Sequence, residues 1–164
     1  MSHALTVRHA IASDVPELGA LIESVYIGEE WSPGSARSRL ADGNWVMTQG
    51  NTLVAETDGR IVGAVLLVLP GQPGRQVGGA TEAEVRLLAV SPHARGLGAG
   101  EALMRRLLED ARSAGFETVV LSTQPGMQAA QRLYERLGFQ RQPGRDWDRP
   151  SGDIRMLVYR LALA

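Results

Sequence analysis

One stretch of the sequence, residues 84–100, strongly constrains the fold, because it predicts a strand, a tight turn and the start of a helix without interruption. Strand-forming residues run up to Val90, and Ser91-Pro92 ends the strand. Apolar residues then recur at helical spacing between Ala99 and Ala114. Three glycines alternate through the turn that joins the two elements: Gly96, Gly98 and Gly100.

This glycine-rich turn is a candidate anion site. The first N–H groups of a helix lack internal acceptors, and the helix dipole adds partial positive charge there. Glycines let an anion approach the main chain, and Arg95 adds a full positive charge at the same place. The turn therefore predicts a pyrophosphate site. The alternatives are a helix start without a ligand and an ordinary surface arginine at position 95.

Three glycine-loop patterns compete for this turn. A P-loop requires Lys and then Ser or Thr after its last glycine, but Glu101-Ala102 follow Gly100. A dinucleotide fingerprint requires a third glycine three residues after the second, where the sequence has Glu101 or Leu103. The pattern that remains is R-x-x-G-x-G, formed by Arg95, Gly98 and Gly100.

The R-x-x-G-x-G pattern resembles the acyl-coenzyme A pyrophosphate signature of the GNAT superfamily of N-acetyltransferases. Residues 130–139 (AQRLYERLGF) are similar to a second motif of that family, A-x-x-L-Y-x-x-L-G-F. The expected element order, β-α-α-β-β-β-α-β-α-β-β, is similar to the GNAT order over essentially the whole chain. We therefore expect an α/β (α+β) fold with a mixed, mostly antiparallel central sheet flanked by helices, in a single domain over residues 1–164.

Local patterns set the expected boundaries, the strongest being a hairpin at Asp58-Gly59 between two apolar runs. The resemblance further implies that the strands ending at Val90 and near Leu121 splay apart to admit the pantetheine arm of the coenzyme. The expected strands are 5–8, 51–57, 60–69, 84–90, 117–122, 139–142 and 154–161. A first helix begins near Ser13 or Asp14, the other helices cover about 35–40, 99–114 and 127–137, and loops cover 28–34, 70–79 and 143–152.

Composition narrows the classes of function. The net charge of −1 gives no basic surplus, so we expect no nucleic-acid or membrane partner. The absence of cysteine excludes disulfides, thiolate metal ligands and an acyl-cysteine intermediate. The longest apolar run, 61–69, is too short to span a bilayer, and a cytoplasmic location is expected. The three histidines lack metal-ligand spacing, so no metal site is expected.

Acetyl transfer to an amine requires a base for the protonated amine, N–H donors for the carbonyl oxygen and an acid for the departing thiolate. The resemblance implies direct attack on acetyl-CoA in a ternary complex. It makes Glu84 the candidate base, acting through water, the Leu88 N–H the candidate oxyanion donor and Tyr134 the candidate acid. The alternatives are that Glu84 is a solvated strand-end carboxylate paired with Arg86, and that Tyr134 is only a core residue.

The resemblance also implies the coenzyme contacts, with Val90 bonding the pantetheine amide through its main chain. The sequence departs from the family at Met127, where an asparagine often bonds the coenzyme; Gln124 and Gln128 are nearby but out of register. The full set of cofactor-binding candidates is Leu88, Ala89, Val90, Arg95, Gly96, Leu97, Gly98, Ala99, Gly100, Met127 and Tyr134.

Acidic and aromatic residues in the loops suit a cationic amine through charge pairing and cation–π contact. For each of them, the alternative is an exposed loop charge or a ring that anchors its loop. The substrate-binding candidates are Tyr26, Glu29, Glu30, Trp31 and Trp147.

The sequence therefore predicts an acetyl-CoA-dependent N-acetyltransferase acting on a primary amine of a small molecule or peptide. Two other functions would use the same turn, namely a non-catalytic acyl-CoA-binding regulatory domain and a nucleotide-binding domain. Homodimers are common in the GNAT family, and the apolar strand at 154–161 is a candidate interface for one.

Overall fold

The computed structural model describes residues 4–27, 39, 41–150 and 152–163. The strands are β1 (Thr6–His9), β2 (Asn51–Thr57), β3 (Arg60–Val68), β4 (Glu82–Val90), β5 (Thr118–Thr123), β6 (Gln140–Arg141), β7 (Trp147–Asp148) and β8 (Arg155–Ala162). The helices are α1 (Val15–Ile22), α3 (Gly43–Gln49), α4 (Ala99–Ser113) and α5 (Gln128–Arg136). A π-helical turn, Glu23–Ile27, follows α1, and 3-10 turns cover Ala12–Asp14, Pro92–Ala94 and Pro143–Arg145.

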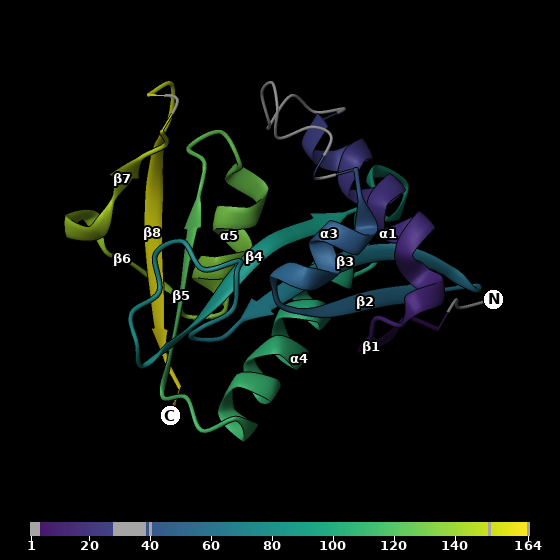
Figure 1. The fold of residues 1–164 in the computed structure, drawn as a ribbon, viewed down its shortest axis with the longest axis horizontal. Coiled ribbons are helices and arrows are strands. Elements are labelled where there is room, and N and C mark those ends of the chain that lie inside the picture. The colour runs from purple at the N-terminus through teal and green to yellow at the C-terminus, as the bar shows by residue number, and fades with distance from the viewer. Residues whose placement is uncertain (1–3, 28–38, 40, 151, 164) are drawn as a thin grey trace.

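The strands form one sheet in the order β1-β2-β3-β4-β5-β8-β6, with β7 paired to β8. Neighbouring strands are antiparallel except β4 and β5, which are parallel. Helices α1 and α3 cover one face of the sheet, and α4 and α5 cover the other (Figure 1). The mixed, mostly antiparallel sheet flanked by helices that the sequence predicts is confirmed.

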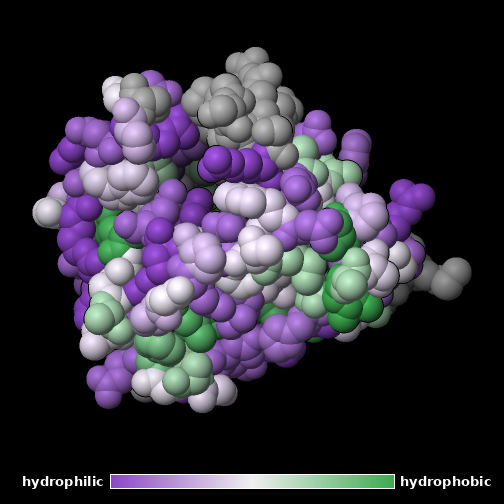
Figure 2. Space-filling model, in the orientation of Figure 1, coloured by the Kyte–Doolittle hydropathy of each residue, from purple (hydrophilic) through white to green (hydrophobic). Residues whose placement is uncertain are grey.

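Two clusters of buried side chains fill the space between the sheet and its helices. Leu103 and Leu107, one helical turn apart on α4, are fully buried against one face of the sheet. Leu18 and Ile22 occupy the same relative positions on α1 and are fully buried against the other face. Outside these clusters, the surface in Figure 2 is mainly hydrophilic, with hydrophobic side chains in small separate groups.

The pairing of β4 with β5 ends halfway along the two strands. It runs from Glu82 opposite Thr118 to Val85 opposite Leu121, although β4 continues to Val90. Beyond that point the strands diverge, and α5 lies in the opening (Figure 1). The splay that the resemblance implied is therefore present in the sheet.

A β-bulge in β4 lies beside this opening. The register between β3 and β4 shifts between Ala64 and Leu66, so that Leu87 and Leu88 of β4 face a single residue of β3. Leu87 has a φ of 53°, a conformation that leucine rarely adopts. A bulge leaves main-chain groups outside the regular ladder. The main chain at Leu88 is therefore available at the opening rather than fully used by the sheet.

Several boundaries differ from those expected. Helix α3 was not predicted; it is short, contains weak helix formers and is capped by Asp42, whose side chain accepts the N–H groups of Asn44 and Trp45. The helix expected at about 35–40 lies, apart from Arg39, outside the described residues. Strand β4 begins at Glu82 and therefore includes Glu84 in its interior.

The last strand is not an open edge. It pairs with β5 on one side and with β6 and β7 on the other, and β7 lies inside the expected loop 143–152. The homodimer expected through this strand therefore stays a prediction. Strand β8 does not offer a free edge that a second copy of the chain could extend. Within the described residues, none of the helices has both the length and the apolar character that crossing a bilayer demands.

Two glycines allow α1 and α3 to pack closely. A Cβ atom at Gly19 would lie 2.4 Å from the carbonyl oxygen of Ala41, and one at Gly43 would lie 2.2 Å from that of Val15. Both distances are far below van der Waals contact, and both partners are main-chain atoms. The position of α3 over the sheet therefore depends on the absence of side chains at these two residues.

We expect Gly43→Ala to lower the free energy of unfolding by about 1–3 kcal/mol, because the added methyl group must push α1 and α3 apart. The matched control is Gly144→Ala, where a Cβ atom would meet nothing within 4 Å. Urea denaturation of the three proteins measures the difference. Equal stability of the two variants would contradict the close packing of the helices.

Candidate active site

Two cavities open along the gap between β4 and β5. The glycine-turn cavity, of about 590 Å³, lies between the β4–α4 turn and the start of α5. The Arg86 cavity, of about 340 Å³, lies among the C-terminal halves of β4 and β5 and the inner face of α5. Leu88, Met127 and Ala130 line both cavities, so the two meet at these residues.

The glycine turn presents its main chain to the first cavity. Gly96 and Gly98 have φ values of 89° and 79°, and a Cβ atom at either would meet nothing within 4 Å. Gly98 is the N-cap of α4 and supplies no side-chain acceptor to the first helical turn. The first N–H groups of α4 therefore receive no side-chain cap, which suits an anion at this helix start.

The charge of the glycine-turn cavity also suits an anion. Arg95, Arg132 and Arg136 line it, and Glu101 is the one acidic residue among its described lining residues. A pyrophosphate with its adjoining phosphate would find positive charge on two sides, from the turn and from α5. The residues present therefore fit the acyl-coenzyme A that the sequence predicts.

Tyr134 faces the Arg86 cavity from α5 while packing in the core. Its side chain is 5% exposed, and its ring lies 5.8 Å from that of Phe139 and 6.1 Å from that of Tyr159. Burial raises the pKa of the Tyr134 hydroxyl well above its usual value, so the hydroxyl keeps its proton at neutral pH. Core packing and a position at the cavity are thus combined in one residue.

A hydrogen bond joins the π-helical turn to the bulge of β4. The hydroxyl of Tyr26 donates to the carbonyl oxygen of Leu88 over 2.9 Å, and both residues line the Arg86 cavity. Trp45 of α3 and Gln76 of the β3–β4 loop (69–81) also line this cavity. Elements distant in the sequence therefore close this cavity around the main chain of Leu88.

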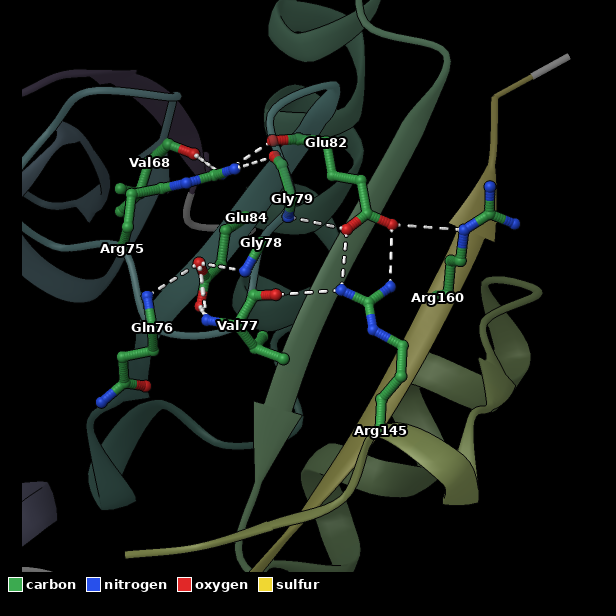
Figure 3. Close-up of polar contacts among 10 residues, drawn as sticks. All are labelled: Val68, Arg75, Gln76, Val77, Gly78, Gly79, Glu82, Glu84, Arg145 and Arg160. Carbon is green, nitrogen blue, oxygen red and sulfur yellow. Dashed lines mark hydrogen bonds and ion pairs between the residues drawn. The ribbon is translucent and has the colours of Figure 1, made fainter. Parts of the chain in front are cut away.

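Glu84 is fully buried and lines neither cavity. Its Oε1 atom accepts the N–H groups of Gln76 and Gly78 at 3.0 Å, and its Oε2 atom accepts that of Val77 at 3.1 Å (Figure 3). The alternative of a solvated strand-end carboxylate paired with Arg86 is therefore wrong. Glu84 instead ties the β3–β4 loop to the interior of β4.

Glu82 joins the same loop to β8. Its carboxylate accepts hydrogen bonds from the Gly79 N–H at 2.9 Å, from Arg145 at 2.8 Å and from Arg160 at 3.4 Å (Figure 3). The hydrogen bonds from Arg145, with smaller help from Gly79 and Arg160, lower the pKa of Glu82 to about 2. Arg75 adds hydrogen bonds to the carbonyl oxygens of Gly79 and Glu82, so that the loop is held from several sides.

The structure brings most of the predicted site residues together. Leu88, Met127 and Tyr134, with Tyr26, line the Arg86 cavity. Leu88 and Met127 also line the glycine-turn cavity. Six further cofactor candidates line that cavity with them: Val90, Arg95, Gly96, Gly98, Ala99 and Gly100.

Other predicted residues lie apart from the cavities. Ala89 is buried in the core on the α1 side of the sheet, and Leu97 is 54% exposed outside both cavities. Trp147 pairs with Met156, which lines the Arg86 cavity, but Trp147 itself does not line it. The candidates Glu29, Glu30 and Trp31 lie outside the described residues.

Sequence reasoning missed several lining residues of the Arg86 cavity, among them the polar residues Arg39, Gln76 and Arg86. Arg86 was considered only as a partner of Glu84. No local pattern separates it from a surface arginine on an alternating strand, because its position depends on the bulge and on the opening of the sheet. Gln76 lies in an irregular loop, whose path is set by its contacts with Glu84.

The comparison with protein families identifies this chain. The sequence model of the Acetyltransferase (GNAT) family matches residues 16–139, and the chain therefore belongs to that family. Among curated relatives, N-acetyltransferase 8F1 of Rattus norvegicus is 33% identical over 119 residues, covering 70% of this chain and 52% of the relative. Mycothiol acetyltransferase of Thermomonospora curvata is 33% identical over 137 residues, covering 84% of this chain and 39% of the relative. The chain thus spans about half or less of these relatives.

Solved structures share the fold over nearly the whole chain. A GCN5-related N-acetyltransferase from Kribbella flavida has a TM-score of 0.75 and 23% identity, with 98% of each chain covered. An acetyltransferase from Salmonella typhimurium, solved with its cofactor acetyl-CoA, has a TM-score of 0.73 and 22% identity, with 98% of this chain and 95% of that chain covered. These likenesses confirm the GNAT fold.

The Glu82 contacts predict a pH-dependent contribution to stability. At pH 7, Glu82→Gln should lower the free energy of unfolding by about 1–3 kcal/mol, because Arg145 and Arg160 lose their charged acceptor. The folded-state pKa lies below the unfolded one, so this stabilisation is present above about pH 4.5 and is lost as the pH falls towards 2. Urea denaturation across that range should show the two proteins converging.

The exposed Glu109 on α4 provides the control, since Glu109→Gln should match the unmodified protein at every pH. A stability difference for Glu82→Gln that stays constant down to pH 2 would contradict the depressed pKa.

Proposed function

We propose that this chain transfers the acetyl group of acetyl-CoA to a primary amine of a small molecule or peptide. The observation that carries the proposal is the meeting of the two cavities at Leu88, with an anion-binding turn on one side and Tyr134 on the other. Membership of the GNAT family supports acetyl transfer from acetyl-CoA. The relatives' names and the acetyl-CoA in the Salmonella structure support the same donor.

The coenzyme would lie along the glycine-turn cavity. Arg95 and the N–H groups from Gly96 to Gly100 would bind its pyrophosphate, and the Val90 main chain would bind the pantetheine amide. Met127, at the position where the family often has asparagine, accepts a 3.8 Å hydrogen bond from the Thr123 hydroxyl at its sulfur and lines both cavities. An apolar contact with the pantetheine arm is the role that its thioether side chain suits.

The reaction follows from the groups at the junction. The amine attacks the acetyl carbonyl carbon, a C–N bond forms and the C–S bond breaks. The Leu88 N–H, at the bulge, would bond the carbonyl oxygen as it gains negative charge. Tyr134, which lines the Arg86 cavity, would give its hydroxyl proton to the departing thiolate. The amine loses one proton to solvent, which can return a proton to Tyr134.

We assign Glu84 to the support of the site rather than to direct proton transfer. Its carboxylate accepts N–H groups on both oxygen atoms and is 0% exposed, so it does not reach an amine in the Arg86 cavity. Its bond to the Gln76 N–H fixes a residue that does line that cavity. The base role through water that the resemblance led us to expect would require a water molecule to reach this buried carboxylate.

The test of the function is release of free thiol from acetyl-CoA in the presence of a panel of primary amines. We expect amine-dependent thiol release, and a kcat about 100-fold lower in Tyr134→Phe with the KM for acetyl-CoA unchanged within about twofold. The matched control is Tyr159→Phe, since Tyr159 packs on Tyr134 but bonds Glu135 and does not line the cavity.

Three outcomes would contradict parts of this proposal. Binding of acetyl-CoA without transfer to any amine would favour the regulatory domain. Binding of ATP but not coenzyme A in calorimetry would favour the nucleotide-binding domain. Equal kcat values for Tyr134→Phe and the unmodified protein would remove Tyr134 from the acid role.

Glu84→Gln should separate the two roles of Glu84. The amide keeps one acceptor oxygen but turns an NH₂ group towards a main-chain N–H, so we expect a loss of about 1–3 kcal/mol in the free energy of unfolding. The pH–rate profile of the variant should keep its shape, with activity reduced at every pH. If the activity of the variant no longer fell as the pH was lowered along the acidic limb of that profile, Glu84 would be restored as the base.

A further inference from the structure

Arg86 brings a guanidinium with unused donors into the cavity proposed for the acceptor. Its Nη1 atom donates to the carbonyl oxygen of Gly74 over 2.7 Å, and among the described residues this is its one hydrogen bond. Burial lowers the pKa of Arg86, but a guanidinium remains charged at neutral pH. A half-buried charge of this kind is stabilised when an anion completes its hydrogen bonds.

The nearest carboxylate does not complete them. Glu84 lies two residues earlier on the same face of β4, but its oxygen atoms accept the N–H groups of residues 76–78 instead (Figure 3). Glu84 attracts Arg86 through space without an ion pair between them among the described residues. The β3–β4 loop thus occupies the carboxylate and leaves the arginine facing the cavity.

The other charges in the cavity are also positive. Arg39 and Arg149 line it with Arg86, and none of its described lining residues is acidic. Arg149 is paired with Asp153 at 3.0 Å, so its charge is partly balanced. Among its described lining residues, Arg39 and Arg86 therefore give the cavity a positive excess.

We propose that the acceptor amine carries an anionic group, a carboxylate or a phosphate, which binds Arg86 while the amine points towards Leu88 and Tyr134. Guanidinium groups match the paired oxygens of both anions. The volume of about 340 Å³ suits a small molecule of amino-acid size, and the rings of Tyr26 and Trp45 provide apolar wall. This inference rests on the acetyl transfer proposed above and names its substrate class.

The proposal differs from the substrate expected from the sequence alone. That expectation placed Glu29 and Glu30 beside a cationic amine, and both residues lie outside the described part of the chain. The described lining residues of the Arg86 cavity instead favour a negative charge on the part of the substrate away from the amine. The amine itself remains the reacting group in both cases.

The test compares acceptors that differ only in the anionic group. Alanine, leucine and phenylalanine are each offered as the acid, the carboxamide and the decarboxylated amine, with O-phosphoethanolamine as the phosphate-bearing acceptor. If the anionic group is a carboxylate, we expect kcat/KM for the best acid to exceed that of the neutral amines at least about tenfold. If the group is a phosphate, we expect the same advantage for O-phosphoethanolamine. A cavity indifferent to charge would favour the carboxamides, whose amines are less protonated.

Variants of Arg86 then test whether this residue causes the preference for anionic acceptors. Arg86→Gln should raise the KM for the preferred anionic acceptor about 10- to 100-fold, with the KM for acetyl-CoA unchanged within about twofold. Arg86→Lys keeps the charge and should recover part of the loss. Arg112→Gln makes the same change on the exposed surface of α4 and should match the unmodified protein.

A binding measurement separates this inference from the proposed function. Calorimetry compares N-acetylleucine with N-acetylleucinamide, and O-phosphoethanolamine with 3-methylbutylamine, on the protein with coenzyme A. Anion-selective binding that Arg86→Gln abolishes, without acetyl transfer to any amine, would refute the function and support the anion site. Transfer to neutral amines at equal or higher efficiency, unaffected by Arg86→Gln, would overturn the inference and leave the function standing. Absence of both transfer and selective binding would overturn both.

Discussion

The end of the parallel pairing between β4 and β5 is the constraint on which the rest of the site depends. After Val85 and Leu121 the two strands no longer share hydrogen bonds, and both cavities occupy the space that opens. The bulge at Leu87 and Leu88 lies beside this space and places main-chain groups where the cavities meet. A continuous sheet would bury the same residues and leave no room for either substrate.

Two buried carboxylates on β4 show how the sheet supports the site. Burying a carboxylate is costly unless its oxygens receive hydrogen bonds. Glu82 obtains them mainly from Arg145, whereas Glu84 obtains them from the main chain of the β3–β4 loop. Both arrangements hold an otherwise irregular loop, and the bond between Glu84 and Gln76 shapes one wall of the Arg86 cavity.

The sequence predicts the parts of this structure that local chemistry determines. The strand, glycine turn and helix around residues 84–100 follow from residue type and spacing, and the glycine turn lines a cavity where the sequence placed an anion site. Helix α3 was missed because it depends on one N-cap and on close packing at Gly43. The contacts of Glu84 were missed because its partners come from a loop without a periodic pattern. The position of Arg86 was missed because it depends on a bulge and on the divergence of two strands.

The positive excess among the described lining residues of the Arg86 cavity has a consequence for the acceptor amine proposed above. A positive charge nearby disfavours an ammonium ion and lowers its pKa, because two like charges repel in a partly desolvated site. With the anionic group of the proposed acceptor paired to Arg86, the charge that remains on Arg39 would increase the fraction of that acceptor present as the neutral, nucleophilic amine. A wall of the cavity can in this way take over part of the work of a general base, and no side chain needs to accept the proton directly.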